Sequence, residues 1–336
     1  MKKTAVVIAP GRGTYNAPEI GYLAQRHADK PDLIRAFDDY RISARQPTLS
    51  ALDGAESFKM SVHTRGDNAS ALIYGCAYAD YLSIDQAEFD ILAITGNSMG
   101  WYIALACAGT LSAQNGMRVV NTMGTLMQDH LIGGQILYPY SDENWQEIPG
   151  AKQALLDKCT DISNRSGNIL SLSIDLGGLL VLAGNEAGIE AFEAELPPIQ
   201  SRFPMRLKNH AGFHSLLQKP VAALGRAALP ESLFQQPKIP LIDGRGAVWY
   251  PKASDLSALW DYTLGQQVVA PYDFAATIRM AAREFCPDVF IVLGPGTTLG
   301  GSVAQSLIRC NWQGWTSKSD FQAAQKTRPD LVSMGG

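Results

Sequence analysis

The sequence has few cysteines, and they follow no pairing pattern. The five cysteines include no CxxC pair and have no histidine at metal-ligand spacing. An odd set without such spacing argues against both a disulfide framework and a zinc site. We therefore expect reduced thiols, no bound metal and a cytoplasmic location.

Long hydrophobic runs and blocks of one charge are also missing. No apolar run approaches the roughly 18 residues of a membrane-spanning helix, and the apolar stretch near Met1 breaks at Pro10-Gly11-Arg12-Gly13 without a signal-peptide cleavage site. The formal net charge is -4, and the 28 Lys and Arg residues form no basic block. We expect a soluble protein whose partners are neither a membrane nor a nucleic acid.

What is present indicates a folded α/β protein. Of the 336 residues, 46% are hydrophobic and 18% charged, enough to bury a large core. Three short apolar stretches, 4–9, 89–95 and 289–293, each run into a glycine-containing turn, as buried strands of a parallel sheet do. Helical spacing of Ala, Leu and Met occurs at 69–81, 99–108, 113–128 and 273–284. Strands that alternate with helices predict an α/β fold.

The middle of the chain has a different pattern. Strand-like and helix-like segments follow one another there in the order β, α, β, β, α, at 135–138, 145–159, 169–175, 179–183 and 186–196. This order predicts a small α+β insertion.

One segment has the pattern of a nucleophile elbow. Gly96-Asn97-Ser98-Met99-Gly100 is a G-x-S-x-G placed between a buried strand and an Ala-rich helix. The glycines allow a sharp turn, and the serine comes at a helix N-terminus, where backbone N–H groups can face a developing oxyanion. We predict that Ser98 is a nucleophile; a structural glycine turn is the alternative.

A serine nucleophile needs a base, and the order of the histidines restricts the choice of enzyme class. In α/β-hydrolases the histidine comes late in the chain, after the acid. Here more than a third of the chain follows His214 without another histidine, and no HGGG-type oxyanion motif occurs. A general esterase of the standard layout fits badly. The candidates for the base are His27, His63, His130, His210 and His214.

The segment from Gly96 to Gly109 resembles the GHSLGEYxALxxAG segment of the malonyl-CoA:acyl-carrier-protein transacylases. Four more segments are similar and lie in the family's order: Pro10–Gly13 to PGQG, Gly212–Ser215 to AFHS, Gln267–Pro271 to QLTSP, and Leu293–Gly296 to VGPG. The resemblance spans nearly the whole chain. It implies an α/β-hydrolase-like core with a parallel sheet, residues 1–130 and 208–336, and an inserted ferredoxin-like subdomain, residues 131–207.

The resemblance also implies roles for individual residues. Ser98 would carry the acyl group, with His214 acting first as general base and then as general acid. The backbone N–H groups of Met99 and Arg12 would form the oxyanion hole, and the main-chain carbonyl of Gln267 would hold the His214 ring. The implied reaction is ping-pong transfer from acyl-CoA to the phosphopantetheine thiol of an acyl carrier protein, with no bound cofactor.

The sequence departs from the family at the expected acyl pocket. Most malonyl transferases carry a carboxylate-binding arginine in an R-G-x-x-M-Q segment, and this chain has Met123 there. A carboxylate buried against a thioether would lose water without gaining a partner, so we expect an uncharged acyl group. Asn97 replaces the usual histidine of GHSLG. Phe213 resembles the bulky residue of malonyl-type members and disfavours a branched acyl group, with core packing as the alternative.

Basic residues near the site are open to two interpretations. Arg12 replaces the glutamine of PGQG and could bind a carboxylate from another direction, but a loop arginine usually points to water, which is what we expect. For His210 we expect a solvated or core role rather than a place at the entrance. The run Arg202, Arg206 and Lys208 could meet an acidic carrier protein, although a solvated face is more common.

The sequence thus predicts a malonyl transacylase-like acyl-CoA:acyl-carrier-protein S-acyltransferase of fatty-acid or polyketide biosynthesis, working through an acyl-serine intermediate. An acyl-carrier-protein thioester hydrolase stays open, because exclusion of water from the acyl-enzyme cannot be read from a sequence. A non-catalytic subunit that docks carrier protein is the third possibility. The intact Ser98, His214 and elbow glycines argue against it.

Overall fold

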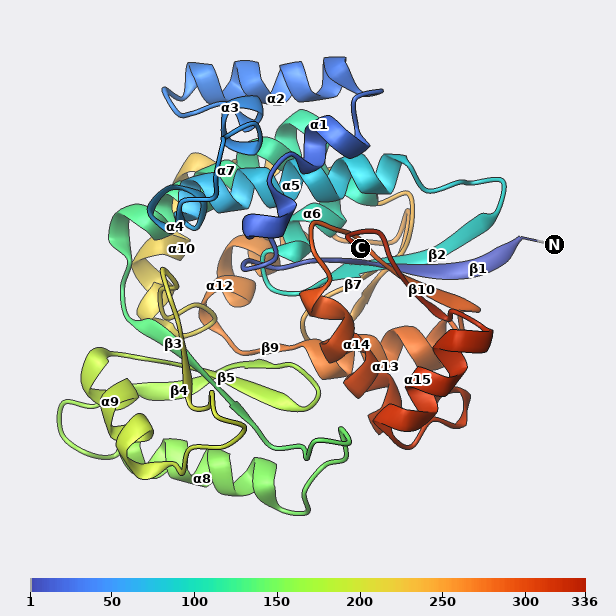
Figure 1. Ribbon diagram of the computed structural model, residues 1–336. Coiled ribbons are helices and arrows are strands. Elements are labelled where there is room, and N and C mark those ends of the chain that lie inside the picture. Colours follow the sequence, from blue (N-terminus) through green and yellow to red (C-terminus); the bar gives the residue numbers. More distant parts are fainter. Residues whose placement is uncertain (1) are drawn as a thin grey trace.

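The computed structural model describes residues 2–336 and contains two β-sheets (Figure 1). The strands are β1 (Lys3–Ala9), β2 (Phe89–Gly96), β3 (Gly134–Pro139), β4 (Leu170–Asp175), β5 (Leu179–Gly184), β6 (Met205–Leu207), β7 (Leu241–Ile242), β8 (Val248–Trp249), β9 (Tyr272–Asp273), β10 (Val289–Val292) and β11 (Leu331–Ser333). The larger sheet has the order β11-β10-β1-β2-β7-β8, and the smaller sheet has the order β6-β3-β5-β4-β9.

Helices surround both sheets, and none of them within residues 2–336 is long and apolar enough to cross a membrane. The α-helices are α1 (Tyr22–Arg26), α2 (Pro31–Ser43), α3 (Leu49–Asp53), α4 (Met60–His63), α5 (Gly66–Leu82), α6 (Gly100–Cys107), α7 (Ala113–His130), α8 (Ala151–Ser163), α9 (Glu186–Glu195), α10 (Lys219–Ala228), α11 (Leu256–Asp261), α12 (Gln267–Val269), α13 (Phe274–Glu284), α14 (Thr298–Arg309) and α15 (Lys318–Thr327). A π-helical turn, η4 (Tyr262–Gln266), leads from α11 into α12.

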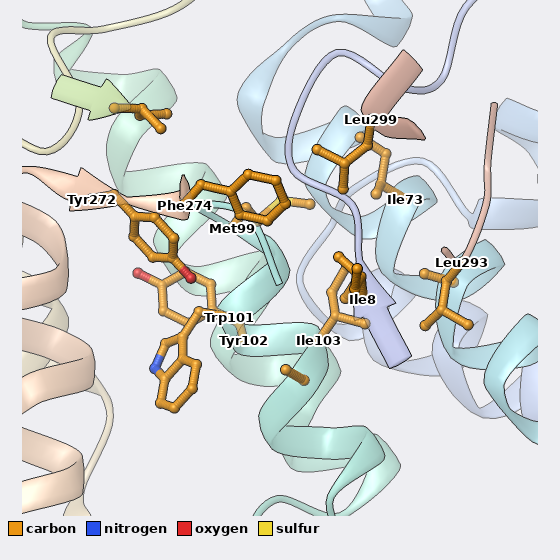
Figure 2. Close-up of a cluster of buried hydrophobic side chains, with 14 of the residues drawn as sticks. Ile8, Ile73, Met99, Trp101, Tyr102, Ile103, Tyr272, Phe274, Leu293 and Leu299 are labelled. Atoms are coloured by element: carbon orange, nitrogen blue, oxygen red, sulfur yellow. The ribbon is translucent and has the colours of Figure 1, made fainter. Parts of the chain in front are cut away.

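The larger sheet confirms the predicted parallel core. β1 lies between β10 and β2 and pairs with both in parallel, and residues 5–9 of β1 are fully buried. Figure 1 shows α5 and α6 on one side of this sheet and α13 and α14 on the other. Apolar side chains from the sheet and these helices meet in one core beneath the β2–α6 turn; Figure 2 shows Ile8, Ile103 and Phe274 among them. The core therefore fixes the position of that turn.

The smaller sheet confirms the predicted ferredoxin-like unit. β3 pairs antiparallel with β5 and β6, and β5 pairs antiparallel with β4, while α8 and α9 connect β3 to β4 and β5 to β6. Figure 1 shows α8 on the side of this sheet that faces away from the larger sheet. The two-residue strand β9, far along the chain, adds to its edge by pairing in parallel with β4. The exact boundaries at 130/131 and 207/208 stay a prediction.

One predicted element begins in the wrong place. The helix expected from residue 145 begins only at Ala151, because Trp145 and Gly150 both have positive φ, at 65° and 76°, and residues 142–150 form turns instead. Pro149-Gly150 is a turn signal directly before the helix, which the apolar spacing obscured. Helices α1 to α4, α10 to α12, α14 and α15 have no counterpart among the predicted elements.

A buried arginine holds three of the helices together. Arg41 of α2 is fully buried, and its guanidinium donates to the carbonyl of Asp67 and to the side-chain oxygen of Asn68, both in α5, at 2.6 Å each. It also donates to the side-chain oxygen of Asn121 in α7 at 2.6 Å and to the carbonyl of Pro47 at 2.8 Å. Burial lowers its pKa. Arg41 thus fixes α2 against the α5–α7 pair.

Candidate active site

The turn between β2 and α6 places Ser98 just beyond the carboxyl end of β2, an inner strand of the larger sheet. Ser98 has a φ of 56°, in the left-handed region that favours glycine, as the nucleophile of an elbow does. A Cβ on Gly96 would lie 2.2 Å from the backbone of Gly100, and one on Gly100 would lie 2.4 Å from the carbonyl oxygen of Ala9. Both positions therefore require glycine, and the turn has the tightness that the sequence predicted.

Ser98 and His214 form a hydrogen-bonded pair. His214 lies on the loop after β6, and its Nε2 is 2.7 Å from Ser98 Oγ, while its Nδ1 is 2.7 Å from the carbonyl oxygen of Gln267. A carbonyl oxygen can only accept, so the Nδ1 nitrogen carries the proton and Nε2 is the free acceptor for the serine hydroxyl. The three residues have the geometry of a nucleophile, a base and an orienting group.

The Gln267 side chain and a tyrosine hold this arrangement in place. Gln267 Nε2 donates to the carbonyl of Ser98 at 3.0 Å, and its Oε1 accepts from the hydroxyl of Tyr102 at 3.1 Å. Tyr272 donates its hydroxyl to the carbonyl of Gly96 at 2.5 Å, and its ring lies 5.4 Å from that of His214. Sequence reasoning assigned only a main-chain role to Gln267 and missed both tyrosines, since hydroxyls reaching back to a turn leave no local pattern.

Two backbone N–H groups next to Ser98 are available to an incoming oxygen. Within residues 2–336, neither the Met99 nor the Arg12 N–H donates to another protein group. Both residues line the pocket that contains Ser98 and His214. Free donors beside a serine nucleophile are what an oxyanion hole requires.

Burial of His214 determines the pH range in which the pair can work. Its side chain is 3% exposed, and burial lowers its pKa to about 4, against a smaller raising effect of the Gln267 carbonyl. The neutral ring, the form that can take a proton from Ser98, therefore prevails at neutral pH.

We expect the rate of acyl-enzyme formation to be independent of pH near neutrality and to fall with an apparent pKa near 4, because protonated His214 cannot act as a base. Rapid quenching and intact-protein mass from about pH 3 to about pH 8 give the profile, with a melting curve at each pH to separate loss of fold from loss of rate. A midpoint near 6.5, the value of a solvated histidine, would contradict the role of burial.

A small, mostly apolar pocket lies beside the pair. Met123 from α7 and Phe213 line it, and both are buried; that they contact the acyl group stays a prediction. Arg12 also lines it, so the expectation that this arginine points to water is wrong. Its guanidinium turns inward because the carbonyls of Thr64 and Asn209 accept its protons, at 2.8 and 3.1 Å.

A larger groove continues from Ser98 between the two sheets. Asn97, predicted to line an acyl pocket, lines this groove and not the apolar pocket beside Ser98 and His214, and its Oδ1 is buried without a partner among residues 2–336. His210, for which a solvated or core role was expected, is half-buried and lines the groove too. Its Nδ1–H donates to Gln135 Oε1 at 2.9 Å, and Gln135 Nε2 donates onward to Ser173. Burial lowers the His210 pKa to about 3, which keeps its ring neutral.

The three basic residues before His214 have different environments. Arg206 forms ion pairs with Glu186 and Glu193 at 2.5 and 2.7 Å. Arg202 is exposed at the groove with its guanidinium 4.5 Å from the Phe203 ring, and Lys208 is exposed. Only Arg202 and Lys208 are therefore candidates for contact with a carrier protein.

Comparison with known proteins agrees with the geometry. No family model matches the chain. It is 26% identical over 306 residues to the malonyl CoA-acyl carrier protein transacylase of Bacillus subtilis, with 90% of each protein covered.

The solved structure of the transacylase of Xanthomonas oryzae has a TM-score of 0.73 at 20% identity, covering 91% of this chain and 92% of that one. A structure of a type II polyketide acyl carrier protein in complex with its malonyl-transacylase has a TM-score of 0.71 at 19% identity, covering 99% of this chain and 95% of that one. In sequence over nine-tenths of its length and in fold, the chain is a homologue of the malonyl-CoA:acyl-carrier-protein transacylases, which are acyltransferases.

Proposed function

We propose that this protein transfers an acyl group from coenzyme A to an acyl carrier protein through an ester on Ser98. The observation that carries the proposal is the 2.7 Å contact between Ser98 Oγ and His214 Nε2 at the elbow. The names of the relatives support the reaction class, and the solved complex of one relative with a carrier protein supports the acceptor. Fatty-acid or polyketide biosynthesis is the setting in which such transfer is used.

The first half of the reaction acylates the enzyme. His214 Nε2 takes the Ser98 proton as Oγ attacks the thioester carbonyl, and the Gln267 carbonyl stabilises the imidazolium through Nδ1–H. The N–H groups of Met99 and Arg12 would bind the oxyanion. When the carbon–sulfur bond breaks, His214 returns the proton to the departing coenzyme A thiol.

The second half regenerates the serine. The phosphopantetheine thiol of the carrier gives its proton to His214 and attacks the Ser98 ester. The new thioester forms, the ester bond breaks, and Ser98 Oγ recovers a proton from His214. The groove that runs from Ser98 between the two sheets offers a path for this arm. The residues need no bound cofactor for either step.

The acyl group need not be held as the malonyl group is in most relatives. Met123 is buried against the pocket and offers neither a charge nor a donor, so from this position alone an uncharged acyl group is favoured. Phe213 narrows the same pocket and disfavours a branch next to the carbonyl.

Transfer predicts a two-stage mass experiment. We expect brief incubation with short acyl-CoAs to give one covalent acyl adduct on the protein, and a chase with holo acyl carrier protein to remove it and produce acylated carrier. The apo carrier, which lacks the phosphopantetheine thiol, is the control and should leave the adduct in place.

Three other outcomes would contradict transfer. An adduct lost at the same rate with apo and holo carrier, with free acid as product, would indicate the thioester hydrolase. Fast turnover of nitrophenyl esters without transfer would indicate an esterase. A protein that binds holo carrier but forms no adduct with any donor would indicate a docking subunit.

A further inference from the structure

The backbone of His214 has a conformation that residues with a Cβ rarely adopt. Its φ is 53°, in the left-handed region, and its ring makes both hydrogen bonds on which the proposed mechanism depends. A strained residue of this kind persists only where the surrounding structure holds it. The peptide between Phe213 and His214 is the part to hold, because φ of His214 is the rotation about the bond that follows this peptide plane.

One side chain holds that peptide. Ser173 of β4 is fully buried, and its hydroxyl donates to the carbonyl of Phe213 at 2.8 Å. Within residues 2–336, no other group donates to this carbonyl, and the His214 N–H, the second polar group of the same peptide, donates to none. Because the carbonyl and the N–H share one plane, the Ser173 hydroxyl sets the orientation from which the His214 side chain projects.

Ser173 occupies an irregular position in its strand. Its neighbours Leu172 and Ile174 lie opposite two consecutive residues of β5, so Ser173 is an extra residue without a partner on that strand. Such a bulge changes the direction of a side chain, and bulges are over-represented next to active sites. The bulge accounts for a hydroxyl that reaches out of the smaller sheet to the loop after β6.

Two further residues orient the Ser173 hydroxyl. Gln135 Nε2 donates to Ser173 Oγ at 2.7 Å, and Gln135 Oε1 accepts from His210 at 2.9 Å. Since the Phe213 carbonyl can only accept, the donors of this chain all point one way, from His210 to Phe213. Gln135 and Ser173 are 3% and 0% exposed, so water does not compete for these bonds.

We infer that Ser173 is a positioning residue for His214. Through the Phe213 carbonyl it fixes the left-handed backbone that lets Nε2 of His214 reach Ser98 while Nδ1 reaches the Gln267 carbonyl. This inference rests on the proposed function. The smaller sheet then contributes to the rate without touching the substrate, because a shift of the base by about 1 Å can lower a rate by about 10²-fold.

The test measures how fast Ser98 is loaded by malonyl-CoA and by acetyl-CoA. Quenched flow and intact-protein mass over a range of donor concentrations give a limiting rate and a half-saturating concentration. We expect Ser173→Ala to lower the limiting rate by about 10- to 100-fold and to change the half-saturating concentration by less than about 2-fold, since Ser173 lines neither the pocket nor the groove.

Two variants on the same strand serve as controls. Ser173→Thr keeps the hydroxyl and is expected to recover most of the rate. Ser171 lies two residues earlier in β4, and its hydroxyl makes no hydrogen bond within residues 2–336, so Ser171→Ala is expected to load at the wild-type rate.

A double variant separates positioning from a general loss of structure. In His214→Ala, a further Ser173→Ala change is expected to slow loading by less than about 2-fold, because no base is left to position. The full additional loss in that background would overturn the inference, as would a wild-type limiting rate in Ser173→Ala.

The remaining outcomes separate this inference from the proposed function. No adduct from either donor on wild type would remove the proposed function and the inference with it. If Ser173→Ala does not fold, Gln135→Met removes the donor that orients the Ser173 hydroxyl. This variant is expected to lower the limiting rate by about 3- to 10-fold, and an unchanged rate would count against the inference.

Discussion

The Ser98→Ala variant is expected to form no acyl adduct with any acyl-CoA, and His214→Ala is expected to form it about 10²- to 10⁴-fold more slowly than wild type. Alanine at 98 removes the oxygen that would carry the acyl group. Alanine at 214 leaves that oxygen and the Met99 and Arg12 N–H groups in place but removes the base 2.7 Å away. Time-resolved intact-protein mass measures both effects.

A second histidine variant controls for the loss of an imidazole ring outside the active site. His130 is exposed at the end of α7, and His130→Ala is expected to load at the wild-type rate. Peptide mapping of the adduct completes the experiment. An acyl group on another residue in Ser98→Ala, or normal loading in His214→Ala, would show that the hydrogen-bonded pair is not the catalytic one.

Arg41→Met is expected to lower the free energy of unfolding by about 3–5 kcal/mol, because it leaves the buried oxygens of three helices without their donor. The affected groups include the carbonyl of Asp67 and the side chains of Asn68 and Asn121, whose contacts with Arg41 are all 2.6 Å. Denaturant unfolding of the purified variants gives the difference. Loading of Ser98 should fall as well, since residues of α5 and α7 line the pocket that contains Ser98 and His214.

The same helix supplies the control for this prediction. Arg35 of α2 is 68% exposed in its side chain and pairs with the more exposed Asp32 at 3.1 Å, so Arg35→Met is expected to change stability by less than about 0.5 kcal/mol. Equal unfolding midpoints for the two variants would show that the buried hydrogen bonds of Arg41 contribute nothing beyond those of a surface arginine.

The features that the sequence predicted well are those with local causes. The elbow at Ser98 depends on residues 96–100 and the strand before them, all adjacent in sequence, and the parallel strands β1, β2 and β10 are visible as apolar runs that end in glycine. The pairing of Ser98 with His214 followed from the resemblance, and their catalytic roles stay a prediction. The order of the five elements from β3 to α9 was also predictable, because each has its own periodicity, whereas the short strand β6 was not predicted.

The features that the sequence did not predict depend on distant residues. The inward turn of Arg12 is set by the carbonyls of Thr64 and Asn209, which lie 52 and 197 residues away in the chain. The place of His210 at the groove depends on Gln135, a residue of the smaller sheet. Helices α1, α3 and α4 have 5, 5 and 4 residues, too few to show a helical period, and α2 is held against α5 and α7 by the contacts of Arg41.

The Gln267 carbonyl that accepts the hydrogen bond from His214 also affects the net charge of the site. Ser98 and His214 are uncharged at rest, and the Gln267 oxygen is the end of a peptide dipole rather than an anion. A carboxylate in its place would oppose the entry of any negatively charged acyl group. With a carbonyl there, no negative charge lies behind the histidine, so the positive charge of Arg12 in the pocket lining is not opposed from that side.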